Sequence, residues 1–291
     1  MVQRIKQAIA SHPVAAFLII LYPVSWVLFL PDLLGKSGFG LISVDVPYQV
    51  GVLLATIFGL TGVAFLVTRL ADGKAGTGAL RRHYYQFRAG PQWYLMAVLG
   101  APLVLLVAGL VSHGSSALSS IGQHGMSYLL NVAVVAVLIS VWEEGGWMGF
   151  MTARLQRRWG PVAASLIVAP CFGFVHFPLF FINGGLIENA HPQGNQVFEY
   201  AFYLLILFSV PVRILITWVF NSTGGSLPVV ALLHASADSA ASIFPDVDGR
   251  WLYIGIAVGA AVVIVMTRGR LGYLGDPADG ATYPMPQPTQ P

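Results

Sequence analysis

The chain has 291 residues, of which 56% are hydrophobic and only 9% are charged. Soluble globular domains have about 25% charged residues, so this composition excludes an ordinary soluble domain and indicates a polytopic membrane protein. The net charge of +3 does not indicate a nucleic-acid-binding protein, because the Lys and Arg residues lie between apolar segments and not on one face.

Eight apolar segments are long enough to be membrane spans, since a spanning helix needs about 20 mainly apolar residues. They are approximately 14–30, 48–68, 92–112, 128–152, 161–181, 197–220, 226–244 and 251–267. Pro13 and Pro161 stand at the starts of the first and fifth segments, where a missing N–H does no harm. Pro211 lies inside the sixth and is expected to kink it.

The basic residues predict which side of the membrane each connection occupies. Lys and Arg gather at the N-terminus, in 69–88, in 154–158 and in 268–270, whereas 113–127 contains none. By the positive-inside rule, both termini are therefore expected on the cytoplasmic side. The protein is predicted to be an all-α membrane protein of about eight transmembrane helices around a polar cavity.

The chain is expected to form one integral membrane domain over residues 1–271. Residues 272–291 are rich in Pro, Gly, Thr and Gln and predict a disordered tail. A plasma membrane is favoured over an organelle, because no organellar targeting segment appears. The single cysteine, Cys171, excludes an intramolecular disulfide.

Five ionisable residues lie deep in three of the apolar segments. Glu143 and Glu144 are in the fourth, His176 is in the fifth, and His234 and Asp238 are in the seventh. A charged side chain at the bilayer centre costs roughly 2.5–3.5 kcal/mol on insertion scales, so such residues usually serve a function. With ~1.5 Å of rise per residue, their depths overlap near the middle of the membrane. We therefore expect all five side chains to line one cavity.

Their spacing suggests different roles. Glu143 and Glu144 are successive and project about 100° apart on a helix, so one is expected to act directly and the other to support it. His234 and Asp238 are four residues apart and share a helix face. Pro178 follows His176 and is expected to loosen the helix where the imidazole is presented.

These residue types permit three kinds of function. A carboxylate beside an imidazole can take a proton from water and pass it to a leaving amine. Glu143, His176 and His234 can alternatively bind a divalent metal such as zinc, leaving one position open for water. Buried carboxylates also occur in ion-coupled transporters, although no internal repeat of the kind that builds many transporters is visible here.

Three motifs in this order resemble those of the CPBP family, the CAAX-protease and bacteriocin-processing intramembrane endopeptidases. Glu143-Glu144-x-x-x-Met148, Phe172-x-x-x-His176 and His234-x-x-x-Asp238 are similar to EExxxR, FxxxH and HxxxN/D. The resemblance covers about residues 128–245. It implies an eight-helix membrane peptidase whose cavity opens to the cytoplasmic side, and this family has been described both as metal-dependent and as glutamate-type.

The resemblance also implies a role for each matching residue. Glu143 with His176 would activate the attacking water, His234 with Asp238 would stabilise the oxyanion of the tetrahedral intermediate, and Glu144 would support them. The substrate would be a peptide or a lipidated protein, such as a prenylated C-terminus, a leader peptide or a membrane-protein segment. Nucleic acid is not expected as a partner, membrane lipids are, and the oligomeric state is not indicated.

The chain departs from the motifs at two positions. Met148 stands where the motif has Arg, so the cation that would keep the carboxylates ionised is missing unless Arg154 or Arg213 reaches in. Asp238 stands where better-known members have Asn, and an ionised Asp would repel an oxyanion unless it is protonated or binds something positive. Both changes predict a more negative cavity, which favours a metal ion or a catalytically weak member that acts as an immunity or scaffold protein.

Overall fold

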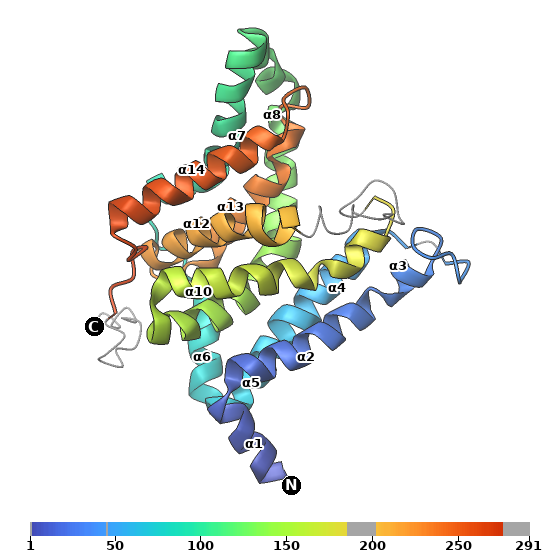
Figure 1. The fold of residues 1–291 in the computed structure, drawn as a ribbon, viewed down its shortest axis with the longest axis vertical. Coiled ribbons are helices and arrows are strands. Elements are labelled where there is room, and N and C mark those ends of the chain that lie inside the picture. The colour runs from blue at the N-terminus through green and yellow to red at the C-terminus, as the bar shows by residue number, and fades with distance from the viewer. Residues whose placement is uncertain (1, 45, 185–201, 276–291) are drawn as a thin grey trace.

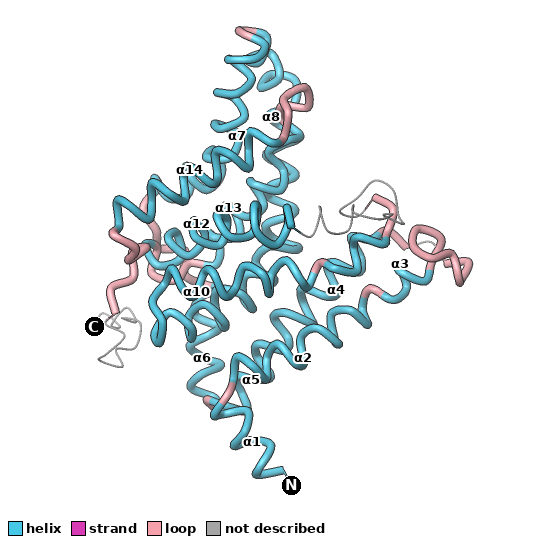
Figure 2. The backbone as a smooth tube through the Cα atoms, viewed as in Figure 1, coloured by secondary structure: helices cyan, strands magenta, loops and turns pink. Residues whose placement is uncertain are grey.

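The computed structural model describes residues 2–44, 46–184 and 202–275, and these residues form helices and no β-strand (Figures 1 and 2). The N-terminal part contains α1 (Val2–Ser11), α2 (Pro13–Leu28), α3 (Leu30–Leu34), α4 (Tyr48–Leu54), η1 (Ala55–Gly62), α5 (Val63–Ala71) and α6 (Gly73–Tyr84). Next come α7 (Pro91–His113), α8 (Ser116–Val135), η2 (Ala136–Ser140), α9 (Val141–Glu144), η3 (Gly145–Thr152), α10 (Ala153–Val175) and η4 (Phe177–Phe181). The last elements are η5 (Tyr203–Phe208), α12 (Ser209–Ser222), α13 (Leu227–Ser239), η6 (Ala240–Ser242) and α14 (Arg250–Thr267).

The all-α membrane class is confirmed, but the count of eight spans is not. Among the described residues, four helical stretches are long and apolar enough to cross a membrane: Tyr48–Ala71, Pro91–His113, Ser116–Phe181 and Arg250–Thr267. The first predicted span corresponds to α2, which meets α1 at a bend of 104°, and the two helices together make a fifth candidate. The orientation of the termini stays a prediction.

Two features explain the difference in count. The stretch Ser116–Phe181 contains both the fourth and the fifth predicted spans, and its 66 residues far exceed the ~20 that a bilayer requires. It changes direction at Gly160, where φ is 77°, and Pro161 begins the next segment as predicted. In addition, α12 and α13 have only 14 and 13 residues, which is short for a crossing.

Two other predictions concern the C-terminal half. The sixth predicted span starts within residues 185–201, which lie outside the described residues, as does 276–291 of the predicted tail. Pro211 is the third residue of α12, which follows the π-helical element η5 without a break, so that Ile206–Ser222 forms one apolar helix with Pro211 inside it. The expected kink at Pro211 stays a prediction.

Two of the hydrophobic clusters in the described part of the chain meet at η3. One cluster joins α7, α8, α12, α13 and α14 and includes Met148, and the other joins α2, α5 and α10 and includes Trp147 and Phe150. In Figure 1, α12 lies between α14 and α10, and it packs against both. Every residue of η3 is buried. The Glu pair at the end of α9 is therefore held at the centre of the bundle.

Close packing of η3 depends on Gly145. A Cβ atom on Gly145 would lie 2.6 Å from Tyr84 Cζ and 2.9 Å from Thr61 Oγ1, and closer still to the Tyr84 hydroxyl. Tyr84 cannot move freely, since its hydroxyl is 2.8 Å from Thr61 Oγ1, which itself donates to the Trp142 carbonyl. This close approach of α6 and η1 to η3 requires a residue without a side chain.

We expect Gly145→Ala to lower the free energy of unfolding by about 1–3 kcal/mol, the usual cost of overpacking a buried contact. The matched control is Gly78→Ala in α6, where a Cβ would meet no atom within 4 Å. That change should leave stability unchanged or raise it by about 0.4–1 kcal/mol. Unfolding in mixed detergent micelles measures both, and equal stability of the two variants would contradict the predicted contact.

Candidate active site

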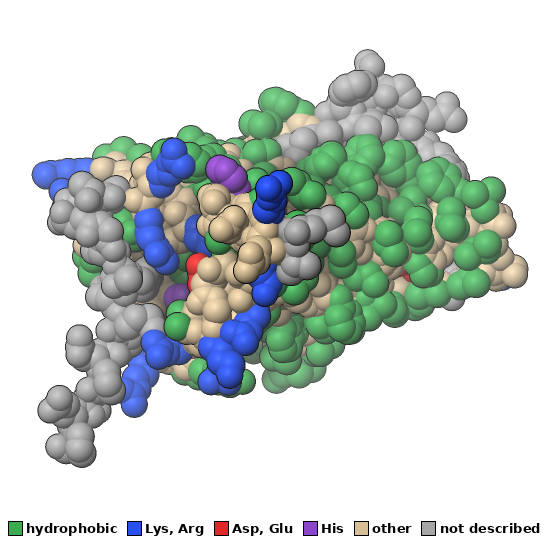
Figure 3. Space-filling model, turned by 90° about the horizontal axis from the view of Figure 1, so that it is seen from below, with side chains coloured by type: hydrophobic (Ala, Val, Ile, Leu, Met, Phe, Trp, Pro, Cys, Tyr) green, Lys and Arg blue, Asp and Glu red, His purple; other side chains and the backbone are tan. Residues whose placement is uncertain are grey.

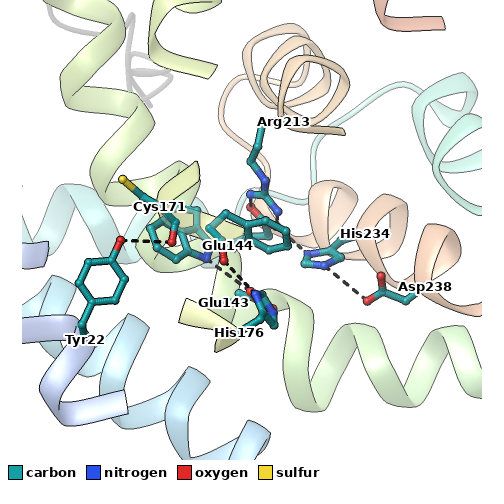
Figure 4. A network of polar contacts seen from close by, with 10 residues as sticks. Tyr22, Glu143, Glu144, Cys171, His176, Arg213, His234 and Asp238 are labelled. Carbon is teal, nitrogen blue, oxygen red and sulfur yellow. Dashed lines mark hydrogen bonds and ion pairs between the residues drawn. The ribbon is translucent and has the colours of Figure 1, made fainter. Parts of the chain in front are cut away.

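The five predicted site residues lie in one polar network, which also includes Arg213 (Figure 4). Four elements supply them. Glu143 and Glu144 end α9, His176 directly follows α10, Arg213 is on α12, and His234 and Asp238 are on α13. The three apolar segments therefore meet at these residues, whereas a cavity lined by all five side chains stays a prediction.

Glu143 and His176 face each other at the edge of the network. Glu143 Oε1 lies 3.6 Å from His176 Nε2, and Trp147 Nε1 donates to the same oxygen at 3.4 Å. His176 Nδ1 lies 2.8 Å from the Phe172 carbonyl oxygen, and because a carbonyl only accepts, Nδ1 carries a proton. This contact fixes the ring so that Nε2 points at Glu143.

The local backbone agrees with the effect expected of Pro178. Helix α10 ends at Val175, His176 caps it, and the 3-10 helix η4 begins at Phe177 with Pro178 in its first turn. The imidazole is thus presented at a helix end. Nearby, the Tyr22 hydroxyl of α2 donates to the Cys171 carbonyl at 3.3 Å (Figure 4). This hydrogen bond ties α2 to the C-terminal part of α10.

Glu144 is the most enclosed member of the network. Its two oxygens each accept a bond of 2.8 Å from the Arg213 guanidinium, and Oε1 also accepts from His234 Nδ1 at 2.6 Å. The side chains of Glu144 and Arg213 are completely buried. A two-pronged Arg–carboxylate pair of this kind is among the strongest hydrogen-bonded arrangements in proteins. It holds Glu144 ionised and fixes the His234 ring.

Arg213 supplies the cation that Met148 cannot, which is one of the two alternatives that the sequence left open. Met148 is buried in the core, where its sulfur accepts from Thr152, and it plays no part in the network. Of the two candidate replacements, Arg154 pairs with Asp72 instead, and Arg213 reaches Glu144. The cavity therefore keeps a positive charge, although the sequence change at position 148 predicts the opposite. The sequence signal for this role of Arg213 was its position as a single Arg inside an apolar segment, because a buried cation requires a partner.

Phe172 has a larger role in the site than sequence reasoning assigned to it. The Arg213 guanidinium lies 4.0 Å above its ring centroid, which is the geometry of a cation–π contact. Its ring also contacts the His176 and His234 rings edge to face, with centroids 4.8 Å and 5.8 Å away. Phe172 thus separates the Glu143–His176 pair from the buried Glu144–Arg213 pair and holds both imidazoles in place.

The network is closed on one side and open on the other. The side chains of Asp238 and His176 are 42% and 19% exposed, whereas Glu144 and Arg213 are not exposed at all. Asp238 Oδ2 lies 3.4 Å from His234 Nε2. Asp238 and His176 therefore form the exposed edge of the network, Glu143 lies buried directly behind His176 with 4% of its side chain exposed, and the Glu144–Arg213 side provides support.

The geometry does not fit the predicted zinc site. No group of three or more His, Cys, Asp or Glu side chains in the described part of the chain is arranged to hold a metal ion. His234 Nδ1 donates to Glu144, and His234 Nε2 lies 3.4 Å from Asp238 Oδ2. In the described part of the chain, Glu143, His176 and His234 are thus not grouped as the ligands of one ion.

Comparisons with known proteins agree with the motifs. Residues 125–240 match the family described as type II CAAX prenyl endopeptidase, Rce1-like. Over 140 residues the chain is 29% identical to CAAX prenyl protease 2 of Methanococcus maripaludis, in an alignment that covers 46% of this chain and 49% of that protein. The chain thus spans about half the length of this curated relative. No solved structure matches the chain.

The matched segment contains all three motifs and Arg213, so the likeness falls on the residues that form the network. The family and the relative are both described as CAAX prenyl proteases. Through residues 125–240, the chain is therefore similar to the Rce1-like type II CAAX prenyl endopeptidases, a likeness that supports membership of the CPBP family.

Proposed function

We propose that this protein is an intramembrane endopeptidase in which Glu143 and His176 activate water for attack on a peptide bond. The observation that carries the proposal is the paired carboxylate and imidazole, 3.6 Å apart at the open edge of the network. This separation is too long for a direct hydrogen bond, but one water molecule can contact both atoms. A base within one water of its target is the geometry that general base catalysis requires.

In the proposed reaction, Glu143 takes one proton from the water as its oxygen attacks the peptide carbonyl carbon. His176 holds the water through Nε2, because Nδ1 is engaged by the Phe172 carbonyl. The attack produces a tetrahedral intermediate with a negative oxygen. When this intermediate collapses, the C–N bond breaks and Glu143 returns the proton to the leaving amine. One water is consumed, and a carboxylic acid and an amine are formed.

His234 is proposed to stabilise the negative oxygen. Its Nδ1 donates to Glu144, so an Nε2 that also carries a proton points toward Asp238, whose Oδ2 lies 3.4 Å away. A hydrogen bond from this Nε2 to the oxyanion would stabilise the intermediate. An ionised Asp238 would then offset the charge of the imidazolium between turnovers.

The substrate that the comparisons favour is a prenylated C-terminal peptide, which both matched descriptions name. A site inside a membrane protein suits a substrate whose lipid chain is already in the bilayer. The alternatives of an inactive scaffold and an ion-coupled transporter are not favoured. The main reason for suspecting an inactive member was the Met148 substitution, and Arg213 supplies the cation.

Hydrolysis of a prenylated peptide in proteoliposomes tests the proposal. In ¹⁸O-labelled water, mass spectrometry is expected to find one heavy oxygen in the new carboxylate of the prenylated product. Cleavage should continue in excess EDTA, because the site offers no three-residue metal ligand set. Loss of activity in EDTA with recovery on added zinc would contradict the glutamate-type mechanism, and cleavage of a leader peptide alone would contradict the substrate assignment.

A further inference from the structure

A cavity with several basic lining residues lies between α5, α6, η3 and α10. It has a volume of about 310 Å³, and its lining includes Arg82, His83, Arg154, Arg157 and Asp72. Gly149 also lines it, five residues after Glu144 on the element that follows the Glu pair. None of the five predicted site residues belongs to this lining. The cavity is therefore distinct from the proposed active site.

The lining carries more positive than negative charge. Asp72 pairs with Arg154, whose guanidinium also donates to the Phe150 carbonyl at 3.1 Å and lies 4.0 Å above the Phe150 ring. Arg82 and Arg157 are exposed and form no ion pair with another described residue. Because only Arg154 has a carboxylate partner, two guanidinium groups at the cavity are left to bind an anion.

The other polar groups of the lining do not change its excess of positive charge. Burial lowers the pKa of His83, so the ring is neutral at pH 7, and its Nδ1 donates to the Gly225 carbonyl at 2.9 Å. Arg154 and Arg157 are three residues apart on α10 and therefore neighbours on one helix face, where like charges repel. An anion beside Arg157 would offset that repulsion.

The cavity lies where phospholipid headgroups would be expected. Figure 3 shows Lys and Arg side chains gathered at one end of the molecule, next to a broad hydrophobic surface. Trp159 is exposed, with the Arg158 guanidinium 5.1 Å from its ring, and an exposed Trp beside basic residues is typical of a membrane–water interface. The segments 69–88 and 154–158 form the face that the positive-inside rule predicts to be cytoplasmic.

We propose that this cavity binds the phosphate group of an anionic phospholipid, held by Arg82 and Arg157. Basic pockets between helices at the cytoplasmic face are a common mode of headgroup recognition. The cavity has room for a phosphate group, with a volume of about 310 Å³. The guanidinium groups supply the paired donors that phosphate oxygens accept. A bound headgroup would rest against η3 at Gly149.

Native mass spectrometry of the full chain in detergent tests this proposal without any assay of proteolysis. The protein is titrated with phosphatidylglycerol and, separately, with zwitterionic phosphatidylcholine. The wild type is expected to bind phosphatidylglycerol more tightly, and Arg82→Gln/Arg157→Gln is expected to weaken that binding about tenfold or more, a loss of about 1.4 kcal/mol, because it removes both guanidinium groups that hold the phosphate in the cavity. Inorganic phosphate is added as a competitor to identify the recognised group.

The matched control is Arg4→Gln/Lys6→Gln in α1, which removes the same charge from two exposed positions of the same basic face. It should weaken phosphatidylglycerol binding less than about twofold. Equal weakening by both double variants would mean diffuse surface attraction and would overturn the proposal, as would equal binding of the two lipids by the wild type. Competition by phosphate at millimolar concentration would support a site for the phosphate group itself, whereas no competition would support the intact lipid as the ligand.

Discussion

Glu143→Gln is expected to lower kcat for peptide hydrolysis by about 10²–10⁴-fold or more, because an amide cannot take the proton of the attacking water. The substitution keeps the shape of the side chain and an oxygen that can still accept from Trp147 Nε1. Melting temperature and KM should therefore change little. Single-turnover release of the cleaved peptide from proteoliposomes measures the effect, with the melting temperature recorded on the same preparation.

Glu144→Gln is the matched comparison, since it changes the neighbouring carboxylate in the same way. Glu144 accepts three hydrogen bonds from Arg213 and His234, so its loss of charge should reduce stability as well as activity. A loss of kcat with intact stability is thus expected only at Glu143. If Glu143→Gln kept more than a tenth of the wild-type kcat, Glu143 would not be the base.

The site residues were predictable because the membrane makes buried charge expensive. Glu143, His176 and His234 were identified by being ionisable within apolar segments, and their motif spacing supplied the roles. The way in which they pair was not predictable. Depth along a helix does not show which ring nitrogen faces which neighbour, and it gave no sign that His234 Nδ1 donates to Glu144.

The pairing of Arg213 with Glu144 was also not predictable, because the two residues lie far apart in the sequence. The motif places its cation four residues after Glu144, on the same helix face, whereas here the cation comes from α12, 69 positions away. Sequence narrowed the choice to Arg154 and Arg213. Only the packing of α10 against α12, and of Arg154 against Asp72, distinguishes the two.

The span count was less predictable, for a different physical reason. A window of about 20 apolar residues measures whether a segment can lie in lipid, but a segment enclosed by other helices can be equally apolar. Helix α13 has 13 residues and packs against α7, α8 and α12, so its apolar character is explained by helix contacts. The turn at Gly160 depends on a single positive φ, which composition does not predict.

Arg213→Met is expected to lower the free energy of unfolding by about 3–5 kcal/mol, the usual cost of breaking a buried ion pair. The destabilisation arises because Glu144 would keep its charge in a completely buried position with only His234 as partner. Unfolding in mixed micelles of dodecyl maltoside and SDS provides the measurement. An Arg213→Met variant as stable as the wild type would show that the pair is not formed.

Glu144→Met/Arg213→Met removes both charges and separates stability from catalysis. Replacing a complete buried ion pair by apolar residues of similar volume is often neutral, so the double variant should recover most of the stability lost in Arg213→Met. Its activity should stay low, because His234 Nδ1 loses the acceptor that orients the ring toward the oxyanion. Recovery of activity together with stability would mean that the pair serves only folding, whereas recovery of stability alone is what a positioning role for Glu144 and Arg213 requires.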